Sequence, residues 1–169
     1  MTKDADYSAY VSARWHVLVR AVVLLGVSRA EAEDVVQSAL ERCYRSWRSV
    51  SDATDPDAYV YRVVVNTLMT SRKRRWWGER PTAAVPEPDP TGDLADRAAV
   101  STSVLSALAR LSPEHREVLV LRFFADLSER QTSEALDIPA GTVKSRVSRA
   151  LAQFAADPAV AGLFDHEEM

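Results

Sequence analysis

Apolar residues recur with the period of an α-helix in the first third of the chain. In the stretch AEDVVQSALERCYRSWRSV, which starts at Ala32, one broad face of a helix is apolar. It carries Val35, Val36, Ala39, Leu40, Cys43, Tyr44 and Trp47. The opposite, polar face carries Asp34, Gln37, Ser38 and Glu41. Because Ser28 and Glu31 have the spacing of a capping box, we predict an amphipathic helix that begins just after Ser28.

A second helix is predicted from Asp57 to about Trp77, because Pro56 is suited to the start of a helix. Its apolar stripe consists of Tyr61, Val64, Val65 and Leu68. Its far side mixes an aromatic ring, an apolar side chain, an amide and cations: Tyr59, Arg62, Val63, Asn66, Thr70, Lys73 and Arg74. Such a mixture is typical of a surface that binds unstacked bases and a phosphate backbone.

The later part of the chain shows a helix-turn-helix pattern. Ser112 and Pro113 are suited to begin one helix, and Ser128 with Gln131 forms a capping box for a short second one. A tight turn over residues 137–139 then leads into GTVKSRVSRALAQF. The exposed side of this last helix is basic, polar and free of acids, with Lys144, Ser145, Arg146, Ser148 and Arg149. Short polar side chains and arginines favour a helix that reads duplex DNA.

Between these two parts the composition changes abruptly. PTAAVPEPDPTGDLAD, residues 81–96, holds four prolines and four acids and has no aromatic residue. Because prolines this dense cannot continue a helix, we predict a flexible linker. The predicted organisation is all-α: a helical domain in residues 1–80, the linker in residues 81–96, a helix-turn-helix domain in residues 97–154 and an acidic tail in residues 155–169.

The composition of the chain argues against a disulfide, a metal site and a membrane span. The formal net charge is −3, and Cys43 is the only cysteine, which excludes an intrachain disulfide and favours a reducing compartment. The three histidines have no metal-ligand spacing, so we predict no metal site. The longest apolar run, residues 17–25, is interrupted by Arg20 and is too short to span a membrane. A cytoplasmic protein is predicted.

One segment is strongly basic, although the chain as a whole is slightly acidic. SRKRRWWGER, residues 71–80, contains five cations and two adjacent tryptophans. Nucleic acid would satisfy both residue types, because it offers phosphates and flat bases. A solvated helix end is the alternative, since cations are favoured at a helix C-terminus. The pattern leaves open whether Trp76 and Trp77 pack inward or face solvent.

Three stretches resemble the extracytoplasmic-function (ECF, group IV) sigma factors of the sigma-70 family, which are small, two-domain specificity subunits of bacterial RNA polymerase. They are AEDVVQSALERCYRSW, DPDAYVYRVVVNTLMTSRKRR and LSPEHREVLVLRFFADLSERQTSEALDIPAGTVKSRVSRAL. RRWWGER and GTVKSRVSRAL are similar to an actinobacterial, sigma-E-like branch. The resemblance covers about residues 7–154 and implies a region 2 domain followed by a region 4 domain.

The resemblance also implies a role for each exposed face. Core RNA polymerase would bind Asp34, Gln37, Ser38 and Glu41. The single-stranded −10 promoter element would bind the loop around residues 51–55 and the following helix, through Ser51, Asp52, Tyr59, Arg62, Val63, Asn66, Lys73, Arg74 and Arg75. The −35 element would bind Thr142, Lys144, Ser145, Arg146, Ser148 and Arg149. The family often has an anti-sigma factor, so the resemblance implies such a partner as well. A monomer without cofactor is expected.

The sequence also bears on two other classes of function. GTVKSRV also resembles the output domain of response regulators, so a helix-turn-helix transcriptional regulator is the alternative function. That class would need a receiver domain or a dimer interface, and residues 1–80 show no alternation of strands and helices. An enzyme is not expected, because the sequence shows no nucleophile–base pair and no glycine-rich phosphate loop.

Overall fold

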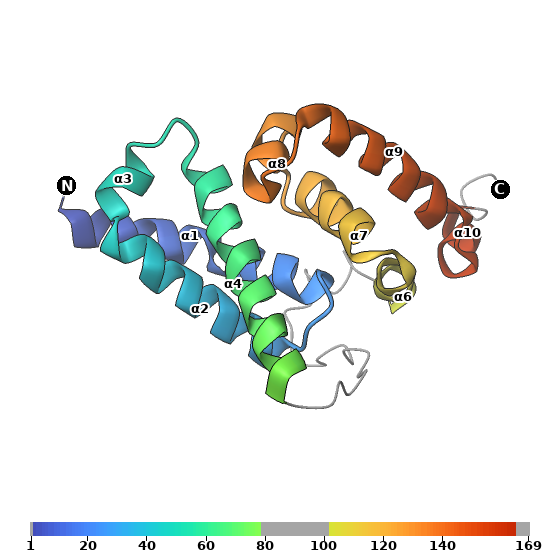
Figure 1. The fold of residues 1–169 in the computed structure, drawn as a ribbon, viewed down its shortest axis with the longest axis horizontal. Helices are drawn as coiled ribbons and strands as arrows, with labels where there is room; N and C mark the ends of the chain where they lie inside the picture. The colour runs from blue at the N-terminus through green and yellow to red at the C-terminus, as the bar shows by residue number, and fades with distance from the viewer. Residues whose placement is uncertain (1, 79–101, 165–169) are drawn as a thin grey trace.

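The structure is a computed structural model that describes residues 2–78 and 102–164, and every element within these ranges is helical (Figure 1). The predicted linker, residues 81–96, lies outside the described residues. The first described range forms α1 (Lys3–Leu24), α2 (Arg29–Arg45), α3 (Trp47–Ser51) and α4 (Pro56–Gly78). The second forms α6 (Thr102–Arg110), α7 (Pro113–Leu119), η1 (Val120–Phe124), α8 (Glu129–Leu136), α9 (Ala140–Ala156) and α10 (Pro158–Phe164).

The predicted amphipathic helix forms as α2, which packs between α1 and α4. It is shorter than the pattern predicts, because the helix breaks at Ser46 and Trp47 of the predicted apolar face begins the short helix α3. Its apolar face is buried as the pattern predicts, except that Tyr44 lies at the edge of the core and stays 37% exposed. The Tyr44 hydroxyl donates to Asp4 at 2.7 Å. Cys43 lies in the core, and burial raises the pKa of its thiol to about 11. The thiol is therefore protonated and inert near neutral pH.

The helix-turn-helix is formed by α8 and α9, as predicted. Ser128 and Gln131 make the full capping box at the start of α8. Asp137 ends α8 in the left-handed region, with φ of 54°, which an aspartate tolerates better than most residues. The helix that begins at Ser112 and Pro113 is α7, and one turn of π-helix, η1, follows it directly. α7 packs against α9 and places that helix on the outside of the domain.

The segment predicted as an acidic tail differs in part from the prediction. α9 continues to Ala156, and α10 then folds back against α6 and α9. Val160 is 1% exposed, and Asp157 accepts from Arg110 at 3.2 Å. An apolar anchor and a half-buried ion pair therefore hold the first part of this segment on the second domain, while residues 165–169 lie outside the described residues.

The two halves pack against each other along α4 and α8 (Figure 1). Their buried apolar side chains form one continuous cluster. Arg72 from α4 and Arg116 from α7 both donate to the backbone carbonyl of Leu25, at 2.5 and 3.2 Å. Gly26 permits this approach, because a Cβ there would lie 2.6 Å from the Arg116 guanidinium, and its φ of 104° also favours glycine.

Candidate nucleic-acid interface

One exposed stripe runs along the outer face of α4. Tyr59, Asn66, Thr70, Lys73 and Trp77 are all exposed, and their spacing of three, four or seven residues keeps them on one side of the helix. The Thr70 hydroxyl donates to the backbone carbonyl of Asn66 at 2.9 Å. The Asn66 amide stays exposed beside it and is available to contact a base edge. Val63, beside the stripe, is half-buried against the core.

A different side of α4 is in contact with the second domain. Arg62, which the pattern groups with the exposed residues, lies 3.5 Å from the Asp137 carboxylate in the turn after α8. In the loop before α4, Asp55 binds Arg130 of α8 at 2.9 Å and also caps α4 through the Ala58 N–H. Residues predicted to bind the −10 element are thus engaged by the second domain in this conformation.

The electrostatics of this contact depend on Asp55. Burial alone would raise the pKa of its carboxyl group, but hydrogen bonds from the Ala58 N–H, Gln131 and Arg130 outweigh that effect and lower the pKa. The carboxylate is therefore charged at neutral pH and holds α8 to the start of α4.

Ser51 and Asp52, two further residues predicted to bind the −10 element, lie just upstream of this loop. The Ser51 hydroxyl donates to the Arg48 carbonyl, and Asp52 is exposed.

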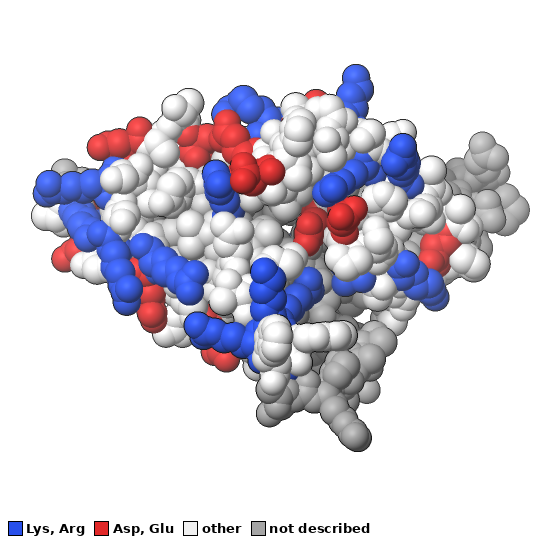
Figure 2. Space-filling model, viewed as in Figure 1, with Lys and Arg blue, Asp and Glu red and all other residues white. Residues whose placement is uncertain are grey.

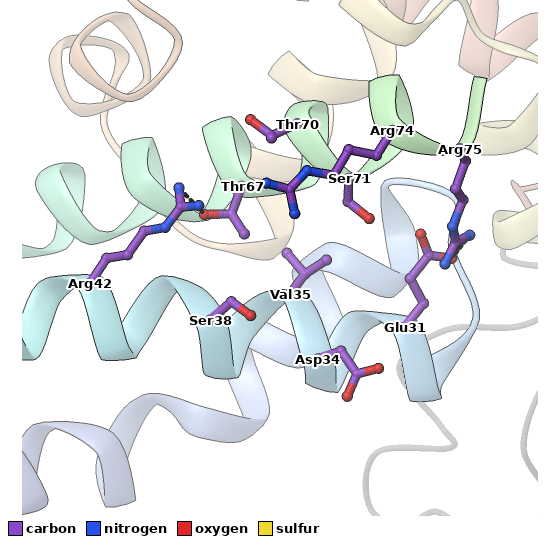
Figure 3. Close-up of a pocket in the computed structure, with 10 residues that line it drawn as sticks. All are labelled: Glu31, Asp34, Val35, Ser38, Arg42, Thr67, Thr70, Ser71, Arg74 and Arg75. Carbon is purple, nitrogen blue, oxygen red and sulfur yellow. Dashed lines mark hydrogen bonds and ion pairs between the residues drawn. The ribbon is translucent and has the colours of Figure 1, made fainter. Parts of the chain in front are cut away.

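The cations near the end of α4 point in different directions. Arg74 and Arg75 line a pocket of about 200 Å³ between α2 and α4, together with Glu31, Asp34, Ser38 and Arg42 (Figure 3). Arg75 binds Glu31 at 2.6 Å, and Arg42 donates to Thr67 at 3.5 Å. Near the end of α4, three cations are predicted to bind DNA, and of these only Lys73 is on the exposed stripe. Arg74 and Arg75 follow it in the sequence and are turned toward α2 by the rotation of the helix.

The polar face of α2 is exposed along its whole length. Asp34, Gln37, Ser38 and Glu41 all face solvent, and the Gln37 amide donates to Glu41 at 3.3 Å. These are the residues that the resemblance assigns to core polymerase. The structure brings them onto one side of the first domain, next to the pocket that holds Arg74 and Arg75.

The outer face of α9 carries most of the side chains predicted to read duplex DNA. Lys144, Ser145, Ser148 and Arg149 are exposed, and Thr142 is half-buried. Arg146 differs from the prediction, because its side chain is only 24% exposed and lies 3.5 Å from Glu114 of α7. Figure 2 shows Lys and Arg side chains on the surface over α9 and near the end of α4.

Sequence reasoning missed the residues that join the domains. Arg116 and Arg130 of the second domain find their partners in the first domain, 91 and 75 residues away in the chain, so no local spacing reveals these contacts. Among the described residues, no cluster of three or more potential ligands could hold a metal ion. In the same ranges, no helix is long and apolar enough to cross a membrane.

Comparison with known proteins identifies both domains. Residues 7–78 match the sigma-70 region 2 family, and residues 101–154 match the sigma-70 region 4 family. The chain is 35% identical over 158 residues to the RNA polymerase sigma-E factor of Streptomyces coelicolor, covering 90% of this chain and 86% of the relative. It is 31% identical over 155 residues to the ECF sigma factor SigL of Mycobacterium tuberculosis, covering 87% of this chain and 83% of that one.

The fold is also similar to a solved structure, that of the Bartonella quintana sigma factor RpoE in complex with the anti-sigma factor NepR. The TM-score is 0.74 with 22% sequence identity, over 96% of this chain and 99% of that one. The chain contains both sigma regions in the expected order and covers more than four fifths of the two relatives named above. It therefore belongs to the sigma-70 family, as an RNA polymerase sigma factor of the ECF class.

Proposed function

We propose that the exposed faces of α2, α4 and α9 each bind a different component of the transcription initiation complex. The polar face of α2 binds core RNA polymerase through Asp34, Gln37, Ser38 and Glu41. The loop at residues 51–55 and the exposed stripe of α4 capture the −10 element as single-stranded DNA. The outer face of α9 binds the duplex −35 element. The free energy that keeps the DNA melted then comes from base capture and polymerase contacts, without a cofactor.

The observation that carries this assignment is the outer face of α9. Lys144, Ser145, Ser148 and Arg149 are exposed on a helix whose residues 140–156 include no acid. An arginine there can reach guanine edges, and short serines let the helix approach the bases closely. Arg146 supports the domain instead, because it pairs with Glu114.

We also propose that promoter binding requires the two domains to separate. In the arrangement that the structure shows, called closed from here on, Arg62 is paired with Asp137 and Asp55 with Arg130. These two side chains must leave their partners before they can contact a DNA strand. An anti-sigma factor would act by favouring this closed state. In support, the solved sigma factor whose fold is similar was determined in complex with an anti-sigma factor.

The experiment separates the polymerase face from the DNA face. An α2 variant, Asp34→Ala with Glu41→Ala, should fail to assemble with core polymerase in a native gel. An α9 variant, Lys144→Ala with Arg149→Ala, should assemble normally. The DNA probe is the set of genomic promoter fragments that bind wild-type holoenzyme. Holoenzyme with the α9 variant should bind them with an affinity about tenfold or more lower, because base and phosphate contacts are lost.

The control is Arg29→Ala with Glu33→Ala, which removes an exposed ion pair from another side of α2. This variant should assemble and bind DNA like the wild type. If the α9 variant loses assembly, or the α2 variant assembles and fails only with DNA, the division of roles proposed for the two faces is incorrect.

A further inference from the structure

The exposed stripe of α4 has an aromatic side chain at each end. Tyr59 is 41% exposed near the start of the helix, and Trp77 is 88% exposed in its last turn. Trp77 lies 18 positions after Tyr59, which corresponds to about 27 Å along the helix axis. That last turn lies at the lower edge of the molecule in Figure 1. Asn66, Thr70 and Lys73 lie between the two rings on the same face.

The second tryptophan has a different direction. Trp76 is 78% exposed, so both indoles face solvent, which settles the alternative that the sequence leaves open. Successive residues of a helix point about 100° apart. Trp77 is therefore aligned with Tyr59 and Asn66, while Trp76 points away from the stripe. Trp76 and Trp77 are both exposed tryptophans in the same helical turn, and they differ only in the side of the helix on which they lie. Trp76 is therefore a matched control for Trp77.

The surroundings of Trp77 indicate the ligand. An exposed indole leaves a large apolar face in water, and a partner that covers it gains free energy. The neighbouring side chains on the stripe are polar or cationic, and residues 66–77 include four cations and no acid. Among these cations Lys73 is the one on the stripe, and an apolar protein surface that covered the stripe would have to take its charge out of water. A nucleic acid strand satisfies both kinds of residue, with its bases on the indole and its phosphates near Lys73.

We propose that Trp77 is a base-stacking residue for single-stranded promoter DNA, and that it extends the strand-binding surface of α4 by one turn beyond Lys73. This assignment rests on the proposed function, because it requires that the stripe of α4 binds the melted strand. Stacking tolerates any base, so Trp77 contributes affinity and positions the strand without selecting sequence. Trp76 has no such contact.

Photo-crosslinking tests the geometry directly. Holoenzyme is assembled from the full-length wild-type chain and core polymerase, and is irradiated with oligothymidylate in which 5-iododeoxyuridine replaces the thymidines. This base crosslinks to aromatic rings stacked on it. Tryptic digestion releases the peptide from Trp76 to Arg80, and fragmentation distinguishes the two tryptophans. We expect the crosslink on Trp77. No crosslink on this peptide, or equal yields on Trp76 and Trp77, would overturn the assignment.

Matched variants test its contribution to affinity. Trp77→Ala holoenzyme should bind the same oligonucleotide about fivefold or more weakly, by fluorescence anisotropy, and Trp77→Phe should recover most of that loss. Trp76→Ala should bind like the wild type. Equal effects of the two alanine variants, or a Trp77→Ala chain that no longer assembles with core polymerase, would contradict base stacking. If base stacking is contradicted in this way but wild-type holoenzyme still initiates at promoters, only the role of Trp77 is wrong and the proposed function stands.

Discussion

At the scale of single residues, Asn66 and Lys73 illustrate two kinds of DNA contact on one helix face. An amide makes directional hydrogen bonds to a base edge, and its energy hardly depends on salt. A lysine near phosphates releases counterions when it binds, so its contribution falls as salt rises. Both side chains are exposed on the stripe of α4, one after the other along the direction of the helix.

These two contacts should separate in a salt titration of holoenzyme on promoter DNA. Lys73→Ala should lower affinity and reduce the slope of log K against log salt by about one. Asn66→Ala should keep the slope and reduce melting of the −10 element, reported by a fluorescent base within it. If the Asn66→Ala holoenzyme melts this element as well as the wild type does, the stripe is a basic surface without base contacts.

At the scale of elements, helix boundaries could be read from the sequence because their causes are local. Ser28, Ser112 and Ser128 each accept from a backbone N–H three residues later, as their positions in the sequence predict. Glu31 departs from the predicted capping box, since its carboxylate turns to Arg75 on α4 and not back to Ser28. A tertiary ion pair has replaced the local bond, and no spacing within α2 indicates that.

The contact between α8 and the start of α4 depends on Arg130. Arg130→Ala should increase hydrogen exchange in residues 52–58 and in α8 of the free protein, because the bond to Asp55 is lost. Glu134→Ala is the matched control, since it removes only the partner of Arg130 within α8. Equal exchange in all three proteins would show that this ion pair does not hold the domains together.

The same contact should depend on pH in a defined direction. The pKa of Asp55 is lowered in the folded protein, below the ordinary value of 3.8. Its stabilising contribution is therefore complete above that value and is lost as the pH falls through the lower, folded pKa. Between pH 6 and 8, roughly the physiological range, no change in this contact is expected. A change of pH within that range therefore does not open or close the contact between α8 and the start of α4.

At the scale of the whole molecule, the sequence predicts the two helical domains and their order, but not how they meet. Period and composition distinguish residues 1–80 from residues 97–154, because each half carries its own apolar stripes. The two domains meet through a shared apolar cluster and through pairs such as Arg62 with Asp137 and Arg116 with the Leu25 carbonyl. Such long-range pairs leave no periodic signal, and neither does α10, which is held by Val160 and Asp157.

Promoter-directed initiation by this chain can be measured by in vitro transcription with core RNA polymerase from the same source. Core enzyme alone should start without promoter selection on a genomic template, and adding the purified wild-type chain should direct initiation to defined start sites. The α2 variant should abolish this selection, and the α9 variant should weaken it. If the chain instead binds duplex operators as a dimer and never changes the start sites of core polymerase, the assignment of its surfaces to initiation is wrong.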